Sequence, residues 1–143
     1  TDSRVKIAGQ DPNSATYVTK NVGLAVPATG LKVMFSASRA ATADIRVAYS
    51  VFRSDIPENE LRYELFPGFD NLDENGIVVD PKNNSGHPDK FVSPSQSREE
   101  FKEYEFTIED IKEFNGFKIK IMMTATNQAY PPLIREFRTI ALS

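Results

Sequence analysis

The segment from Phe117 to Met123 constrains the fold most, because apolar residues stand at every second position in it. Positions 117, 119, 121 and 123 are Phe, Ile, Ile and Met, whereas positions 118 and 120 are both lysine. Successive side chains of a strand point to opposite faces of the sheet, while those of a helix recur every 3.6 residues. The pattern therefore predicts a strand with one buried face and one solvated face.

Two earlier segments, residues 31–37 and 45–52, show the same alternation. The inward positions of the first are Leu, Val, Phe and Ala, and those of the second are Ile, Val, Tyr and Val. Only a short, turn-like stretch around Thr42-Ala43-Asp44 separates them. Because short connections favour adjacent elements, we expect these two strands to pair antiparallel.

Further strands are predicted at residues 17–22, 104–108 and 133–142, which are rich in β-branched and aromatic side chains. The last of these is predicted less clearly, because its apolar residues occur at both odd and even positions. Thr107 followed by Asp110 resembles a capping signal, so one short helical turn is expected near residues 108–114. Several strands with turns between them and little helix predict an all-β, antiparallel β-sandwich, plausibly jelly-roll-like.

The middle of the chain, at about residues 53–100, is different in composition. It contains more than half of the nine prolines and much of the Asn, Asp, Ser and Gly. A stretch of this kind predicts one or two short strands and a long loop excursion over the surface. The first residues are polar and include Gly9 and Pro12, so residues 1–14 are interpreted as a linker remnant and residues 15–143 as one sandwich domain.

Composition narrows the classes of function. A chain of 143 residues with 40% hydrophobic and 26% charged residues matches ordinary globular usage. The formal net charge of −3 gives no basic field for nucleic acid, and the apolar runs are too short to insert in a membrane. With no cysteine, neither disulfides nor thiolate chemistry can operate.

Two polar features in the excursion are candidate sites. His87 is the only histidine, and it is interpreted as a solvated loop residue, because turn-forming residues surround it. The acidic stretch at residues 70–80 offers the oxygen ligands that calcium favours, but its spacing is not that of an EF-hand. We therefore keep two alternatives open, a solvated acidic loop and a calcium site formed by Asp70, Asp73 and Asp80. No other cofactor is expected.

Aromatic residues in or beside the loops provide a second candidate site. Tyr63, Phe69 and Tyr130 could stack on sugar rings, because an aromatic ring presents a flat apolar face. The alternative is that such rings cover one end of the hydrophobic core, as aromatic residues do more often. Carbohydrate binding at these three residues is therefore a hypothesis beside a structural role.

The charged residues give no sign of catalysis. Pairs such as Glu58 with Glu60, or Glu99 with Glu100, are the residue types of glycosidases, but one sequence does not show their separation. No nucleophile motif, phosphate-binding loop or metal signature is present, so we expect no enzymatic activity. Four basic residues could form a stripe across two paired strands, although solvated charges are the simpler interpretation: Lys118, Lys120, Arg135 and Arg138.

A resemblance to a known family rests on several of these segments. Residues 17–22 (Tyr-Val-Thr-Lys-Asn-Val) and 44–49 (Asp-Ile-Arg-Val-Ala-Tyr) resemble two of its strand patterns, and residues 104–111, 114–121 and 131–142 resemble its C-terminal part. The family is that of virion structural proteins of large tailed bacteriophages, including those of cyanobacteria. The resemblance spans residues 14–142, but it departs at Phe137, where leucine is commoner, and residues 70–94 do not align.

The resemblance implies a virion location in the tail, baseplate or fibre, without catalytic residues. The expected function is a non-enzymatic structural domain whose partners are other virion proteins or further copies of itself. The alternative is a β-sandwich that binds a host-surface glycan or receptor during attachment. A similarity of the last two strands to discoidin-like carbohydrate-binding jelly rolls favours that alternative only by analogy of fold.

Overall fold

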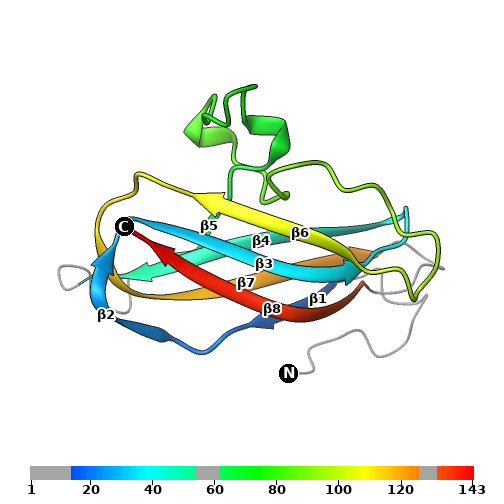
Figure 1. Ribbon diagram of the computed structural model, residues 1–143, viewed down its shortest axis with the longest axis horizontal. Helices are drawn as coiled ribbons and strands as arrows, with labels where there is room; N and C mark the ends of the chain where they lie inside the picture. Colours follow the sequence, from blue (N-terminus) through cyan, green and yellow to red (C-terminus); the bar gives the residue numbers. More distant parts are fainter. Residues whose placement is uncertain (1–13, 54–61, 126–131) are drawn as a thin grey trace.

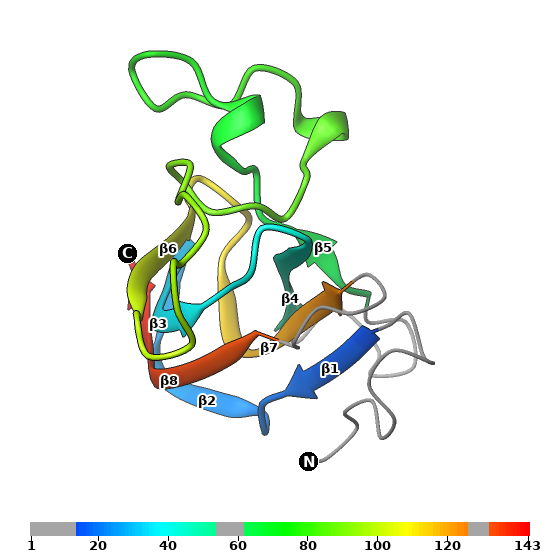
Figure 2. The ribbon, with the colours of Figure 1, turned by 90° about the vertical axis from the view of Figure 1, so that its right-hand side faces the viewer.

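The computed structural model of the protein describes residues 14–53, 62–125 and 132–143. Two antiparallel sheets pack against each other, which confirms the predicted all-β sandwich (Figures 1 and 2). Within the described ranges, no helix is long and apolar enough to cross a membrane. The strands are β1 (Ser14–Val18), β2 (Val22–Ala28), β3 (Gly30–Ser38), β4 (Ala43–Phe52), β5 (Glu64–Leu65), β6 (Lys102–Ile108), β7 (Phe114–Ala125) and β8 (Leu133–Leu142).

The larger sheet has the order β1-β7-β4-β5, and β2 also pairs with β7. β7 is its central strand and pairs with β4 from Ala43 opposite Ala125 to Phe52 opposite Gly116. The alternation predicted for residues 117–123 is confirmed, because the side chains at 117, 119, 121 and 123 are buried. The inward positions of β4 are likewise buried at 45, 47 and 49, and Val51 is half-buried.

The smaller sheet has the order β6-β3-β8. The inward side chains of β3 at positions 31, 33, 35 and 37 are all fully buried, as the alternation predicts. Phe35 stacks on Tyr104 and Phe106 of β6, with ring centroids 5.6 and 5.4 Å apart. Phe66 reaches the same cluster from beyond β5, at 6.0 Å from the Phe106 ring. The core therefore lies between the two sheets and contains most of the aromatic rings of the body.

The predicted pairing of residues 31–37 with 45–52 is wrong, because β3 and β4 belong to different sheets. Each strand has an inward face of large apolar side chains, and crossing between the sheets lets these faces cover one another. Arg39 holds this crossing through three hydrogen bonds from its guanidinium group, to the Tyr104 hydroxyl (3.1 Å), the Ala43 carbonyl (2.9 Å) and the Val92 carbonyl (2.7 Å). A short connection thus joins facing strands and not neighbouring ones.

β8 pairs with β3 and not with β7, so the basic stripe that was considered beside the preferred interpretation of solvated charges does not lie across two paired strands. β4 pairs with one edge of β7, and β1 and β2 with the other, which leaves no edge of β7 for the last strand. The lysines of β7 lie over the Tyr63 ring, whereas Arg135 lies over the Phe101 ring and Arg138 bonds to Glu103. The four basic side chains therefore belong to two different sheets.

The strand predicted at residues 17–22 is divided in two, since β1 ends at Val18 and β2 begins at Val22. Both parts pair with β7, and Thr19 lies between them. The Thr19 amide donates to the Ile119 carbonyl, and the Thr19 hydroxyl accepts from the Ile119 amide, both at 2.9 Å. A side chain thus replaces a backbone acceptor where the edge strand is interrupted.

The helical turn predicted near residues 108–114 is absent from that segment. Thr107 belongs to β6, and its hydroxyl donates to the Asp89 carboxylate at 2.6 Å instead of capping a helix. Asp110 has a φ of 60°, which turns the chain, and the Ile111 amide then donates to the Thr29 carbonyl. Among the described residues, short 3-10 turns lie elsewhere, at η2 (Phe69–Asn71) and η3 (Pro81–Asn83).

The described residues of the long excursion contain little regular structure, as predicted. Its described residues contain the short strand β5, an isolated bridge between Leu72 and Val78, and the two 3-10 turns. Residues 69–84 project from the body as a compact unit, here called the lobe, at the top of Figures 1 and 2. The linker predicted at residues 1–14 lies outside the described residues except for Ser14, which begins β1.

Candidate functional site

Two glycines let the lobe leave the body of the sandwich. Gly68 and Gly86 have φ values of 89° and 81°, a region that side chains with a Cβ rarely adopt. A Cβ on Gly68 would lie 2.1 Å from the Ser85 hydroxyl, and one on Gly86 would lie 2.8 Å from a Leu65 methyl carbon. The Gly86 carbonyl accepts from the Val47 amide at 2.8 Å. The two ends of the lobe are thereby fixed beside β4.

Asn71 is the buried centre of the lobe, with 5% of its surface exposed. Its side-chain amide donates to the Asp80 carbonyl at 2.7 Å and to the Asn84 side-chain oxygen at 2.8 Å. Its side-chain oxygen accepts from the Asp80 amide at 3.1 Å, and its own carbonyl accepts from the Val79 amide. One polar side chain thus replaces an apolar core in this part of the molecule.

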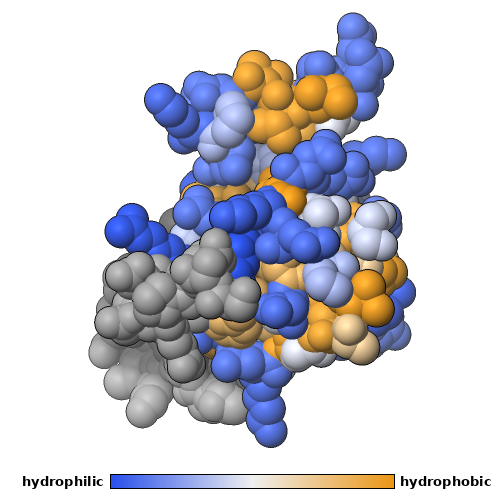
Figure 3. All heavy atoms as spheres, turned by 90° about the vertical axis from the view of Figure 1, so that its left-hand side faces the viewer, coloured by the Kyte–Doolittle hydropathy of each residue, from blue (hydrophilic) through white to orange (hydrophobic). Residues whose placement is uncertain are grey.

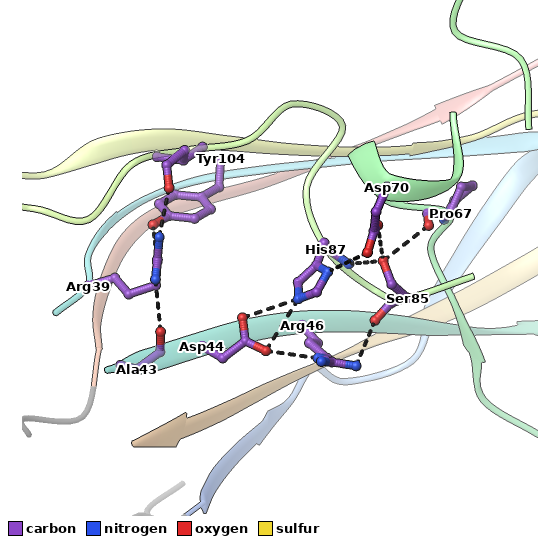
Figure 4. A network of polar contacts seen from close by, with 10 residues as sticks. Arg39, Ala43, Asp44, Arg46, Pro67, Asp70, Ser85, His87 and Tyr104 are labelled. Atoms are coloured by element: carbon purple, nitrogen blue, oxygen red, sulfur yellow. Dashed lines mark hydrogen bonds and ion pairs between the residues drawn. The ribbon is translucent and has the colours of Figure 1, made fainter. Parts of the chain in front are cut away.

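His87 connects the lobe to β4 (Figure 4). Its Nδ1 lies 3.2 Å from an Asp70 carboxylate oxygen of the lobe, and its Nε2 lies 3.3 Å from the Asp44 carboxylate of β4. The ring also stacks on Phe69, with centroids 5.5 Å apart, and only 19% of the side chain is exposed. The interpretation of His87 as a solvated loop residue is therefore wrong.

The two carboxylates beside His87 favour their ionised forms. Burial raises the pKa of Asp44, but hydrogen bonds from Arg46 and the attraction of His87 outweigh it, so the pKa is below its usual value. Burial also raises the pKa of Asp70, and hydrogen bonds from Ser85 and His87 bring it below the usual value. The two ring nitrogens of His87 thus each face a carboxylate oxygen, one from the lobe and one from β4.

The hydrogen bonds of this network do not form the serine–histidine pair of a serine nucleophile. A serine nucleophile needs its hydroxyl hydrogen-bonded to a base such as a histidine ring. The Ser85 hydroxyl instead donates to Asp70 at 2.6 Å and accepts from the His87 backbone amide at 3.2 Å. Both ring nitrogens of His87 already face carboxylates. The arrangement is suited to holding the lobe in one position on the body.

A groove of about 690 Å³ lies between the lobe and the connection from β6 to β7. Apolar side chains line both of its walls: Leu72, Ile77, Val78 and Pro81 from the lobe, and Ile108 from the end of β6 with Ile111 from the connection. Ile77 is 61% exposed, and Val79, also in the lobe, is 68% exposed. Figure 3 shows apolar side chains gathered on the lobe. An apolar cleft with a few polar groups is the usual form of a binding site.

The charged residues of the groove are mostly acidic. Asp89, Glu109 and Asp110 line it together with one basic residue, Lys90. Asp89 also covers the edge of β6, because its amide donates to the Glu105 carbonyl and its carboxylate accepts from the Thr107 amide. Burial and, to a smaller degree, the charge of Glu105 raise the pKa of Asp89, although its hydrogen bonds with Thr107 oppose this.

The structure gives each carboxylate of the calcium hypothesis its own protein partners. Asp70 bonds to Ser85 and His87, while Asp73 accepts from the amides of Asn75 and Ile77. Asp80 caps η3 by accepting from the Lys82 amide. In the part of the chain that the structure describes, no group of three His, Cys, Asp or Glu side chains is arranged to hold a metal ion. Calcium binding stays a prediction.

The three aromatic residues of the carbohydrate hypothesis lie in different surroundings. Tyr63 lies under the lysines of β7, and Phe69 stacks on His87 and contacts the Phe91 ring edge-on at 5.6 Å. Tyr130 lies outside the described residues. The described part therefore does not place the rings of Tyr63 and Phe69 in contact, and a role of all three in sugar binding stays untested.

The paired glutamates show no shared site in the described ranges. Glu58 and Glu60 lie outside them, and Glu99 and Glu100 are both exposed. Glu100 accepts a hydrogen bond from the Gln96 amide at 2.6 Å, which closes a local turn. This geometry is that of a solvated surface segment.

Sequence reasoning did not identify Asn71, which holds the lobe, or Arg39, which holds the crossing from β3 to β4. The available signals were the two dipeptides Pro67-Gly68 and Ser85-Gly86 at the ends of the lobe, which mark sharp turns. No signal paired His87 with Asp44, since these residues are distant in the sequence. Comparisons with known protein families, curated proteins and solved structures found no match to this chain.

Proposed function

We propose that the chain is a non-enzymatic structural module of a tailed-phage virion, held in the particle by protein contacts of its lobe. The resemblance of its strand sequences to virion structural proteins supports the proposed location in a virion. The observation that carries the proposal is the exposure of large apolar side chains on and beside the lobe, at Ile77, Val79 and Phe91. Apolar groups exposed on a firmly held projection favour contact with another protein.

The construction of the lobe supports this function. Its ends are fixed by Gly68 and Gly86, its interior by Asn71, and its contact with β4 by His87. A surface that is already ordered loses less conformational entropy on binding than a mobile loop does. The sandwich is thus a rigid support, and the lobe is the element that meets a neighbouring component.

The test is incorporation into particles. Virions are purified by density gradient from a host that produces the full chain with a Val79→Lys substitution, and the chain is quantified by mass spectrometry. We expect the unchanged chain to be present in a fixed ratio to the other particle proteins, and the variant to be lost from them. The matched control is Val26→Lys, since Val26 is 71% exposed on β2, away from the lobe.

Absence of the unchanged chain from the particles would overturn the proposal. Equal incorporation of the Val79→Lys and Val26→Lys variants would overturn the role of the lobe. A glycan array tests the alternative function, which is host attachment. Sugar binding by the unchanged chain that disappears with Phe91→Ala would favour a receptor-binding module instead of a structural one.

A further inference from the structure

The groove beside the lobe has the chemistry of a site for a short extended segment of protein. Its two walls are apolar, with Ile77 and Val78 on one side and Ile108 and Ile111 on the other. Its charged groups are three carboxylates and one lysine, which gives a formal excess of negative charge, and Asn75, Asn84 and Thr107 are its uncharged polar residues. A ligand that fits both features presents apolar side chains on one face and basic side chains on the other.

The chain itself contains such a segment near its start. Residues 4–7 read Arg-Val-Lys-Ile, so basic and apolar residues alternate. In an extended conformation Arg4 and Lys6 point to one side, and Val5 and Ile7 point to the other. The two apolar side chains match the walls of the groove, and the two basic side chains match its acidic residues.

Ile7 of the same copy is tethered too far away to reach Ile111 of the groove. Ser14 lies opposite Thr124 of β7, whereas Ile111 lies just before Phe114, at the other end of that strand. The distance between these ends of β7 is about 33 Å at roughly 3.3 Å per residue. The residues between Ile7 and Ser14 reach at most about 25 Å when fully extended. A second copy of the chain is therefore the better source of the segment.

We infer that the groove binds residues 4–7 of a second copy of this chain, which joins successive copies head to tail. Val5 and Ile7 pack between the lobe and the β6–β7 connection, and Arg4 and Lys6 pair with Glu109, Asp110 and Asp89. The inference rests on the proposed function, because it names the partner that the lobe contacts in that function. It predicts an open-ended row of copies, because the two surfaces that meet, the groove and residues 4–7, are different.

The test uses the full chain in sedimentation velocity at low salt, together with a synthetic peptide of residues 2–9. We expect self-association that weakens at least tenfold with Lys6→Glu and with Glu109→Lys, and that returns when both substitutions are in one chain. The matched control is Glu103→Lys, the same charge change on the outer face of the smaller sheet, which leaves association unchanged. The peptide is expected to shift the amide resonances of residues 77–78 and 108–111.

A chain that stays monomeric at all concentrations would overturn the inference, and so would a peptide with Arg4 and Lys6 changed to glutamate that shifts the same resonances. Loss of association with Glu103→Lys would also overturn it. Particle incorporation that is lost with Val79→Lys but kept with Lys6→Glu would leave the proposed function intact and refute only this partner.

Discussion

The body and the lobe of this protein are held together by opposite means. The body buries aromatic and branched side chains between two sheets, and many of them, such as Phe106 and Ile119, are fully buried. The lobe buries a polar residue, Asn71, and leaves Ile77 and Val79 exposed. Burial of apolar surface is favourable because it removes that surface from water, so the exposure of these side chains on a firmly bonded unit is the observation on which the proposed partner contact rests.

The largest effect is expected from a cavity in the body. Phe106→Ala removes a ring that contacts both Phe35 and Phe66, and it should lower the free energy of unfolding by about 3–5 kcal/mol. Urea unfolding followed by circular dichroism measures this loss. The matched change Val26→Ala, at an exposed apolar position of β2, should cost no more than about 0.5 kcal/mol. Similar losses for both variants would contradict the assignment of Phe106 to the buried core of the body.

A smaller and more local effect is expected in the lobe. Asn71→Asp keeps the shape but removes the two N–H donors that reach Asp80 and Asn84, which should cost about 1–3 kcal/mol. Hydrogen exchange should increase at the amides of Val79 and Asp80 and stay unchanged in β3 and β7. Faster exchange throughout the sandwich would show that the lobe and the body unfold as one unit.

Acid should loosen the lobe before it affects the body. The pKa values of Asp44 and Asp70 are lowered, so their ionised forms stabilise the fold above about pH 4, and this contribution is lost as the pH falls through the lowered values. Asp89 acts in the opposite direction, since its raised pKa favours the protonated form in the folded state. Amide resonances of residues 69–84 followed during an acid titration should change first.

The double variant Asp44→Asn with Asp70→Asn is the control for this titration. It should remove the difference between lobe and body, because no carboxylate then faces His87 in this network. A lobe that loosens over the same pH range in the double variant would show that other groups are responsible.

The smallest effect on stability is expected from Val79→Lys. The side chain is 68% exposed, so the free energy of unfolding should change by no more than about 0.5 kcal/mol in thermal or urea unfolding. A loss above that range would mean that Val79 packs within the lobe, and its use as a probe of partner contact would fail.

Periodicity predicted the strands well where one face of a strand is buried. The inward positions from Leu31 to Ala37 of β3 and from Phe117 to Met123 of β7 were identified, because alternation is local and the core requires it. Phe114, the buried first residue of β7, was expected in a helical turn. The pairing of β3 with β4 was predicted wrongly, since local sequence does not show whether a short connection turns within one sheet or crosses to the facing one. The loop excursion was recognised from its prolines and polar residues, but its folded lobe was not.

The candidate site could be predicted only in part for a related reason. Gly68 and Gly86 signalled turns, yet the partners of His87 come from β4 and from η2. The calcium and carbohydrate hypotheses considered the chemistry of single residues and could not include the hydrogen bonds that Asp70, Asp73 and Asp80 make within the fold.

The sequence by itself determined that this protein is built from strands, since the two-residue alternation of apolar side chains is a property of each segment alone. The tertiary structure decided which strands pair, where the lobe sits and what surrounds His87. Those features depend on contacts between residues that are distant along the chain, and their energies arise only after the sheets have packed together.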